Sequence, residues 1–167
     1  EVYAHEGMEL PYADASHVHS SEQFVLSERA TPAPVQAKGR TPEISENIAA
    51  YVITAGKVTV TIDKTTGYLA GYQDGGRQML KAQMVPNFWR AEIDNDWRGW
   101  KPSHYLRVWK TAPEKLSEPV ITTSVDGSVA VVSVTRTLEG ERAELSLKYM
   151  MYPDGRLNVS YDIRIAE

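Results

Sequence analysis

The stretch VITTSVDGSVAVVSVTRT, residues 120–137, gives the strongest indication of the fold. Two runs rich in β-branched residues, 120–125 and 128–137, flank the pair Asp126-Gly127. β-Branched side chains favour strands, and Asp-Gly suits a two-residue turn because glycine adopts positive φ at no steric cost. The stretch therefore predicts an antiparallel β-hairpin.

The same reading extends in both directions along the chain. Further strands are predicted where apolar and polar residues alternate, with turns rich in Gly, Asp and Pro between them. The predicted strands are 57–62, 68–72, 143–152 and 156–165, and the predicted turns are 63–67, 74–76 and 153–155. Only residues 102–110 suggest a short helix. Short, regularly spaced strands predict an all-β protein built as an antiparallel β-sandwich.

Composition limits the partners that this chain is suited to bind. The 167 residues are 42% apolar and 24% charged, which is typical of a globular domain. The net charge of −4, without a run of Lys or Arg, predicts neither a nucleic-acid partner nor a membrane partner. Cysteine is absent, which excludes disulfides and thiolate metal sites within the chain.

One domain boundary is visible in the sequence. Residues 30–42 contain three prolines and a glycine with few apolar anchors, a composition typical of a linker. Residues 1–29, with strands expected at 3–10 and 17–26, are too few to form a domain, whereas residues 43–167 contain the sandwich pattern. The chain begins at Glu1 and its strand pattern still runs at its last residues, so we expect a piece of a longer protein. Its compartment stays open.

Residues 86–100, PNFWRAEIDNDWRGW, combine aromatic and charged side chains in an unusual density. Indole rings stack on sugar faces, and Arg90 and Asp94 are the kind of groups that hydrogen-bond sugar hydroxyls. The alternative is that the aromatic residues anchor a long loop to the core. That alternative applies equally to each of the chain's four tryptophans and to Phe88 and Tyr105 beside them; the tryptophans are Trp89, Trp97, Trp100 and Trp109.

Two other groupings carry weaker signals. Asp94-Asn95-Asp96 offers two carboxylates, which glycoside hydrolysis or a calcium ion could use, but the local pattern favours a turn in which these side chains bond their own backbone. His17-Val18-His19 lacks a third ligand, so we expect no metal site there.

A family resemblance rests on residues 87–96, which read NFWRAEIDND. They resemble the F-W-R-A-P-x-D-N-D signature of the large bacterial β-galactosidases, in the glycoside hydrolase family that also contains β-glucuronidases and β-mannosidases. Residues 57–80 resemble the start of that family's C-terminal β-sandwich. Residues 12–17 and 22–26 resemble the end of the immunoglobulin-like domain before it. The resemblance covers most of residues 10–110, in the family's order.

The sequence departs from this signature at two places. Glu92 stands where proline is usual, and Trp97-Arg98-Gly99 replaces a shorter step to glycine after the second aspartate. The first change is expected to loosen the backbone and the second to shift the following loop. Neither removes Arg90 or the three residues 94–96.

The resemblance implies that this chain is a non-catalytic C-terminal piece of a β-galactosidase-like enzyme. It would carry the tail of an immunoglobulin-like domain (1–29), a linker (30–42) and the first part of a galactose-mutarotase-like supersandwich (43–167). In that family both catalytic carboxylates belong to a (β/α)₈ barrel, so the barrel and the rest of the enzyme are the expected partners. The substrate of the whole enzyme would be a β-galactoside, hydrolysed in the cytoplasm or periplasm of a bacterium.

The resemblance also supplies the expected site residues. The loop after the D-N-D motif, here from Trp97 to about Ser103, lies near the mouth of the family's active site and moves on substrate binding. Two tryptophans, Trp89 and Trp100, are candidates for stacking on sugar. The other expected residues, near substrate or supporting the loop, are Arg90, Asp94, Asn95, Asp96, Trp97, Arg98 and Gly99. We expect no catalytic residue, metal ligand or cofactor in this chain; the resemblance suggests that the whole enzyme needs Mg²⁺ and Na⁺.

Two other functions compete with this interpretation. A free-standing carbohydrate-binding β-sandwich would also suit the tryptophan cluster, and a structural or adhesive module would need no small ligand. Sheet edges left open at the chain ends also predict a homodimer formed through exposed strand edges.

Overall fold

The computed structural model describes residues 2–3, 18–26, 37–138 and 143–165. The chain divides into two compact units, residues 1–35 and 36–167. In the first unit β1 (Val2–Tyr3) and β2 (Val18–Ser20) pair antiparallel. The strand predicted at 17–26 is therefore shorter than expected, while most of the strand predicted at 3–10 lies outside the described residues.

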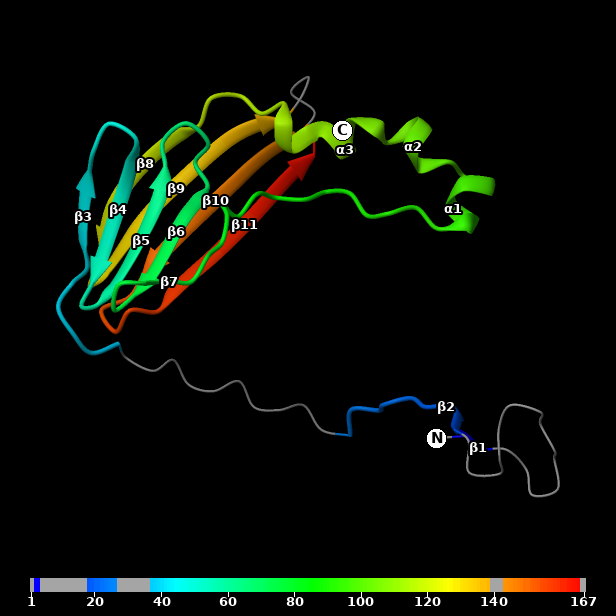
Figure 1. The fold of residues 1–167 in the computed structure, drawn as a ribbon, viewed down its shortest axis with the longest axis horizontal. Coiled ribbons are helices and arrows are strands. Elements are labelled where there is room, and N and C mark those ends of the chain that lie inside the picture. Colours follow the sequence, from blue (N-terminus) through cyan, green and yellow to red (C-terminus); the bar gives the residue numbers. More distant parts are fainter. Residues whose placement is uncertain (1, 4–17, 27–36, 139–142, 166–167) are drawn as a thin grey trace. The chain divides into compact units, whose positions relative to one another are not determined.

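The second unit contains two antiparallel sheets. The first has the order β3-β4-β5-β6-β7, and the second has the order β11-β10-β9-β8. In Figure 1 the cyan and green strands of the first sheet lie over the yellow-to-red strands of the second. The bounds in the first sheet are β3 (Glu43–Glu46), β4 (Ala50–Ala55), β5 (Val58–Asp63), β6 (Leu69–Asp74) and β7 (Arg77–Gln78). Those in the second are β8 (Val120–Asp126), β9 (Val129–Leu138), β10 (Ala143–Met151) and β11 (Leu157–Ile165).

The hairpin predicted at residues 120–137 is confirmed. β8 and β9 pair up to Asp126↔Val129, and Gly127 has φ of 60°, the left-handed conformation that the Asp-Gly turn requires. The strands predicted at 57–62, 68–72, 143–152 and 156–165 correspond to β5, β6, β10 and β11 within one or two residues at each end.

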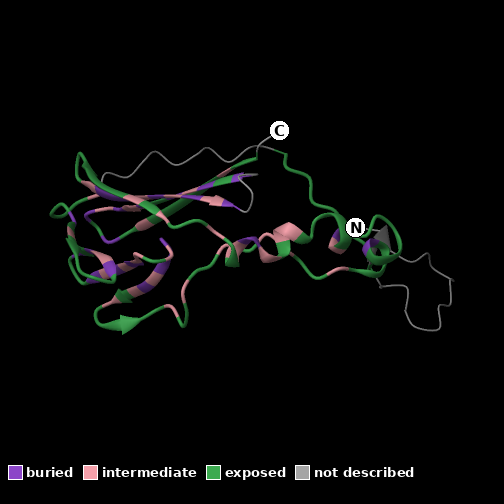
Figure 2. Ribbon diagram, turned by 90° about the horizontal axis from the view of Figure 1, so that it is seen from above, coloured by how far each residue is buried: buried purple, intermediate pink, exposed green. Residues whose placement is uncertain are grey.

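The core lies between the two sheets. Along β5 the side chains of Val58, Val60 and Ile62 are buried while the residues between them are half-buried, as period-2 alternation requires. They belong to one cluster with Val132 of β9 and Leu145 of β10. Figure 2 shows this alternation of buried and more exposed positions along the strands. The expected all-β antiparallel sandwich is confirmed.

Several elements were not anticipated from the sequence. β3 is rich in glutamate, β4 has four consecutive apolar residues instead of alternation, and β7 has only two residues. Between β7 and β8 the chain forms α1 (Asp94–Arg98), α2 (Pro102–Tyr105), α3 (Arg107–Thr111) and the 3-10 turn η1 (Ala112–Glu114). The helical segment expected at 102–110 is confirmed as α2 and α3. α1 was missed because five residues are too few to show a helical period.

A buried arginine ties the two sheets to the segment that follows the helices. The Arg136 side chain of β9 is 8% exposed. Its guanidinium donates to the backbone carbonyls of Thr66 (2.7 Å), Ser117 (2.8 Å) and Leu116 (3.4 Å). These bonds satisfy a charged group in the interior and fix the end of the helical segment against the sandwich. Among the described residues no helix is long and apolar enough to cross a membrane.

Candidate functional site

Two aromatic residues anchor the helical segment to the sandwich. Phe88 and Trp109 meet edge to face, with ring centroids 6.0 Å apart and planes at 70°. Both pack against a small buried cluster of Ala112 in η1, Leu138 at the end of β9 and Ala143 at the start of β10. Anchoring by aromatic residues, one of the two explanations open from the sequence, therefore applies to Phe88 and Trp109.

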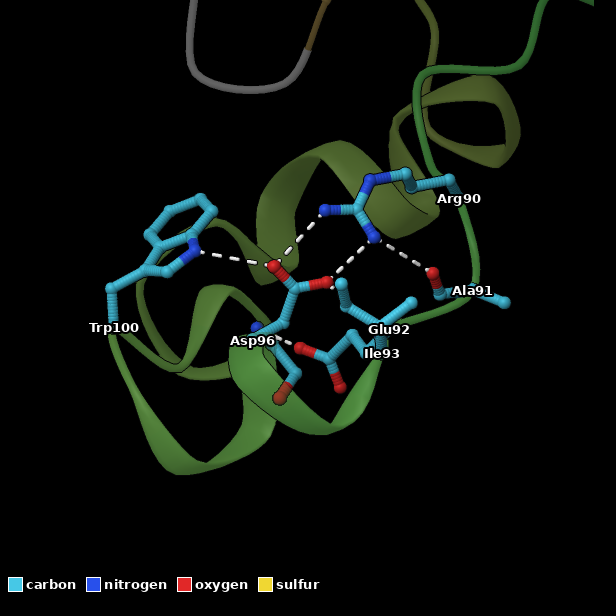
Figure 3. A network of polar contacts seen from close by, with 7 residues as sticks. Arg90, Ala91, Glu92, Ile93, Asp96 and Trp100 are labelled. Carbon is cyan, nitrogen blue, oxygen red and sulfur yellow. Dashed lines mark hydrogen bonds and ion pairs between the residues drawn. The ribbon is translucent and has the colours of Figure 1, made fainter. Parts of the chain in front are cut away.

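The carboxylate of Asp96 is the centre of the polar contacts in this segment (Figure 3). It is 5% exposed. Arg90 donates two hydrogen bonds to it, from Nη1 to Oδ2 at 2.6 Å and from Nη2 to Oδ1 at 3.0 Å. The backbone N–H of Ile93 donates to Oδ2 at 3.0 Å, and the indole Nε1–H of Trp100 donates to Oδ1 at 3.3 Å. Both carboxylate oxygens are thus fully used.

These contacts hold Asp96 in its charged form. The Arg90 guanidinium, followed by the Ile93 N–H, lowers the pKa of Asp96 from 3.8 to about 2. The same ion pair raises the pKa of Arg90. A carboxylate that is charged and saturated with donors is poorly suited to act as a general acid near neutral pH, because such a group needs a pKa near the working pH. The contacts of Asp96 suit a structural role instead. We call Asp96 and its three donor residues, Arg90, Ile93 and Trp100, the Asp96 brace.

Asp96 also explains why α1 begins where it does. It is the third residue of the helix, and it accepts the N–H of Ile93, the residue before the helix. An acidic side chain at this position of a capping box satisfies one of the backbone donors that a helix start leaves free. Ile93 has no side-chain oxygen to complete the box, so Asp96 supplies the side-chain half of it alone.

A second carboxylate fixes the start of α2. Lys101, the residue before this helix, lies in the left-handed region with φ of 53° and makes no side-chain cap. Glu92 caps the helix in its place. Its Oε1 accepts the N–H of Ser103, which lies eleven residues further along the chain, at 2.8 Å. Asp96 and Glu92 therefore hold the two ends of residues 97–103, which we call the 97–103 loop.

A small cavity lies beside this brace. Its volume is about 160 Å³, and Trp89, Arg90, Asp96 and Trp100 contribute to its wall. The rest of the wall consists of Phe88, Glu92, Pro102 and Leu106. Trp100 is 55% exposed, so one indole both forms the wall and faces solvent. A polar brace beside exposed aromatic surface is a geometry that suits a ring-shaped polar ligand.

The structure brings together four of the nine expected site residues. Trp89, Arg90, Asp96 and Trp100 line the cavity, whereas Asp94 and Arg98 lie outside its wall and form an exposed ion pair of 3.2 Å. Trp97 is 69% exposed and also lies outside the wall. Asn95 and Gly99 do not line the cavity either. The Asn95 carbonyl accepts the N–H of Gly99 at 2.9 Å, which closes the last turn of α1.

One contributor was not among the expected residues. From the sequence, Glu92 stands out only as a replacement for proline. The structure shows that it accepts a hydrogen bond across the 97–103 loop. The sequence signal was available in Pro102-Ser103, a typical helix start that lacks a capping side chain at Lys101.

The described residues contain no group of three or more His, Asp or Glu side chains arranged to hold a metal ion. The side chains of the His17-Val18-His19 motif are not part of this statement, because His17 and the His19 side chain lie outside the described residues.

Comparison with known proteins assigns the chain to a family. The family described as β-galactosidase small chain matches residues 54–166. The chain belongs to this family. The match runs from the end of β4 to the end of β11, so it includes the helical segment and its brace as well as the sandwich strands.

Individual members of the β-galactosidases agree with this assignment. The β-galactosidase of Priestia megaterium is 26% identical over 156 residues, which are 93% of this chain and 15% of that enzyme. Those of Halalkalibacterium halodurans and Klebsiella pneumoniae are 30% and 31% identical over 104 and 107 residues, 60% of this chain and 10% of each enzyme. The chain therefore spans 10 to 15% of the length of these three relatives. It is related to one part of a much larger enzyme.

Proposed function

We propose that this chain is a non-catalytic part of a β-galactosidase, and that its 97–103 loop completes the edge of a β-galactoside site whose catalytic carboxylates lie in the remaining polypeptide. The observation that carries the proposal is the Asp96 brace, which presents the Trp100 indole in a fixed position beside a cavity. The relatives, all β-galactosidases about six times longer, supply the substrate class.

The absence of a free acid–base pair in the brace supports a non-catalytic role. Glycoside hydrolysis ordinarily uses two carboxyl groups, one acting as acid and the other as nucleophile or base. The Asp96 carboxylate accepts four hydrogen bonds, and Asp94 forms an ion pair with Arg98 at the surface. The expected partner is therefore the rest of the enzyme, including a (β/α)₈ barrel, and any Mg²⁺ or Na⁺ would belong there. Residues 1–29 would be the tail of an immunoglobulin-like domain, residues 30–42 a linker, and residues 43–167 the first part of the supersandwich.

A chimeric enzyme tests this role. This chain would replace the matching 156-residue segment of the Priestia megaterium β-galactosidase. Trp100→Ala in the chimera is expected to raise KM for lactose about tenfold or more, taking the roughly 1–3 kcal/mol of base–aromatic stacking as the guide for a sugar ring on an indole. Trp97→Ala serves as the comparison, because its indole lies outside the cavity wall. Equal kinetic constants for the chimera and both variants would contradict the proposal.

A second function is favoured by the two exposed indoles, Trp97 and Trp100. A free-standing carbohydrate-binding sandwich would use them without any partner. It is distinguished by saturable binding of galactose or lactose to the isolated chain, followed by tryptophan fluorescence. The proposed role as part of an enzyme predicts no saturable binding by the chain alone.

A further inference from the structure

Glu92 has a carboxylate oxygen that its role in the fold leaves unused. Its Oε1 accepts the N–H of Ser103 at 2.8 Å, and among the described residues this is the only hydrogen bond of the Glu92 side chain. The residue is half-buried and lies beside the Asp96 brace (Figure 3). An ionised carboxylate accepts hydrogen bonds at both oxygens, so Oε2 is available to a ligand.

The cavity beside the brace is where such a ligand would meet Glu92. Its wall comes from residues 88–106 and includes Glu92, Arg90, Trp89 and Trp100. Pockets that enclose a whole small ligand usually measure about 300–1,000 Å³. The volume of about 160 Å³ is about half of the lower value, so the cavity suits a single ring of a larger ligand.

Arg90 supplies hydrogen-bond donors to the same cavity. Its guanidinium donates two hydrogen bonds to Asp96 and one to the carbonyl of Ala91, whereas its Nε–H donates to no described residue. The wall therefore offers a free donor on Arg90 and a free acceptor on Glu92. A hydroxyl group both donates and accepts, so neighbouring hydroxyls of one sugar ring can use both groups at once.

An acidic group on the ligand is unfavourable at this position. A carboxylate or sulfate has no proton to donate to Glu92 Oε2, and like charges that lie close together repel each other. Arg90 does not offset this repulsion, because its charge is paired with Asp96 at 2.6 and 3.0 Å. The wall contains one cation and two anions, which favours a ligand with uncharged hydroxyl groups.

The other basic residues of the helical segment do not change this balance. Four of them are exposed and lie outside the wall, namely Arg98, Lys101, Arg107 and Lys110. Water and salt screen exposed charges, with a screening length of about 8 Å at physiological ionic strength. The charge that a ligand meets inside the cavity is therefore set mainly by the residues of the wall.

The position of the catalytic groups decides which ring of a β-galactoside can occupy the cavity. During hydrolysis the anomeric carbon of the galactosyl ring must lie against the catalytic carboxyl groups. The proposed function assigns those groups to the remaining polypeptide. A ring held by this chain is therefore the leaving-group sugar, on the other side of the cleaved bond.

We propose, on the basis of that function, that the cavity binds the leaving-group sugar of a β-galactoside and that Glu92 restricts it to sugars without an acidic group. Oε1 of Glu92 holds the 97–103 loop, and Oε2 accepts a hydrogen bond from a sugar hydroxyl. Arg90 donates to a neighbouring hydroxyl, and an indole of the wall packs on the apolar face of the ring. Glu92 is then a specificity-determining residue as well as a helix cap.

The test uses two substrates that differ at one group of the leaving-group ring. They are methyl β-lactoside and its derivative with a carboxylate in place of the CH₂OH group of the glucose ring. Both are compared in the chimeric enzyme described above, whose fold is checked by its hydrolysis of a nitrophenyl β-galactoside. The ratio of the two kcat/KM values measures the preference for the uncharged sugar.

Glu92→Gln separates the two roles of this side chain. Glutamine keeps an oxygen for the Ser103 N–H, but it removes the charge and replaces the second acceptor by a donor. We expect the preference for methyl β-lactoside to fall about fivefold or more, chiefly through KM, while hydrogen exchange of the Ser103 amide stays unchanged. In the unmodified chimera the preference should weaken as salt is raised.

Glu114→Gln is the matched control. It also removes one carboxylate charge from the helical segment, but Glu114 is exposed in η1 and lies outside the cavity wall. It should leave the preference between the two substrates unchanged. An equal fall in Glu114→Gln and Glu92→Gln would overturn the inference, because the effect would then come from the general charge of the surface.

An unchanged preference in Glu92→Gln would also overturn the inference, as would equal kcat/KM values for the two substrates in the unmodified chimera. These results are distinguishable from a failure of the proposed function. If Trp100→Ala leaves the hydrolysis of lactose unaltered, the proposed function itself fails. If Trp100→Ala raises KM while Glu92→Gln leaves the preference unchanged, only the role of Glu92 in specificity fails.

Discussion

Arg90 and Asp96 form a two-bonded ion pair, with N–O distances of 2.6 and 3.0 Å, six residues apart in the chain. The pair spans the turn into α1. Asp96 also accepts the indole N–H of Trp100, which restricts the position of that side chain. Planar guanidinium–carboxylate pairs of this kind fix orientation as well as distance. The brace therefore links the backbone before α1 to an exposed indole after it.

Replacing Asp96 by alanine should release the 97–103 loop while the sandwich stays folded. Four hydrogen bonds are lost, among them those from Ile93 and Trp100. We expect amide hydrogen exchange at Ile93 to accelerate about tenfold or more. Asp94→Ala is the control, since Asp94 makes only an exposed ion pair with Arg98. Equal exchange at Ile93 in the two variants would show that Asp96 is not the brace.

Glu92 can be tested through the one bond it makes across the loop. Glu92→Ala removes the acceptor for the Ser103 N–H, whereas Glu92→Gln keeps an oxygen at the same place. Exchange of the Ser103 amide should be fastest in the alanine variant and close to the original rate in the glutamine variant. Fast exchange in the unmodified chain would mean that the cap is not formed in solution.

The brace should be insensitive to pH until strongly acidic conditions. The pKa of Asp96 is lowered from 3.8 to about 2 in the folded protein, chiefly by Arg90. A depressed carboxyl pKa contributes stability that is fully present above the unfolded value and is lost as the pH falls through the folded value. Tryptophan fluorescence should thus change with a midpoint near pH 2, and Asp96→Asn should abolish that transition. A midpoint near 4 would contradict the ion pair.

Tyr149 connects the two sheets through a single hydrogen bond. Its hydroxyl donates to the carbonyl of Gly67 at 3.1 Å, and burial raises its pKa to about 12. Tyr149→Phe leaves this carbonyl unpaired in the interior, so we expect a loss of about 1 kcal/mol and a melting temperature lower by roughly 3 °C. Tyr105→Phe, at an exposed hydroxyl, should leave the melting temperature unchanged. A similar shift in melting temperature in both variants would show that the Tyr149 hydroxyl does not stabilise the fold through this hydrogen bond.

Gly67 shows where a sequence pattern and the packing behind it differ. The sequence predicts a turn at 63–67 from its residue types, and the turn is present, closed by the N–H of Gly67 donating to the carbonyl of Asp63 at 2.8 Å. The reason that glycine is required is not local. Its φ is 71°, and a Cβ there would lie 2.4 Å from Cγ1 of Val134 in the opposite sheet. Only the packed sandwich reveals that constraint.

The sandwich and the site were predictable to different degrees for the same physical reason. Long alternating runs such as β9 and β10 repeat one local rule many times, so the sequence predicts them well. The site depends on single contacts between Arg90 and Asp96 and between Glu92 and Ser103, which no periodic pattern encodes. The D-N-D motif indicated a turn, and the structure shows that turn wound into the start of a helix by the Asp96 side chain.

The most direct test of the central claim is an assay of the purified 167-residue chain with a chromogenic β-galactoside, with tryptophan fluorescence followed during titration with millimolar galactose and lactose. We expect no hydrolysis and no saturable fluorescence change, because the proposed function assigns the catalytic groups and the rest of the sugar site to the remaining polypeptide. Hydrolysis by the pure chain would contradict the account outright. Saturable binding without hydrolysis would instead establish a self-sufficient carbohydrate-binding module.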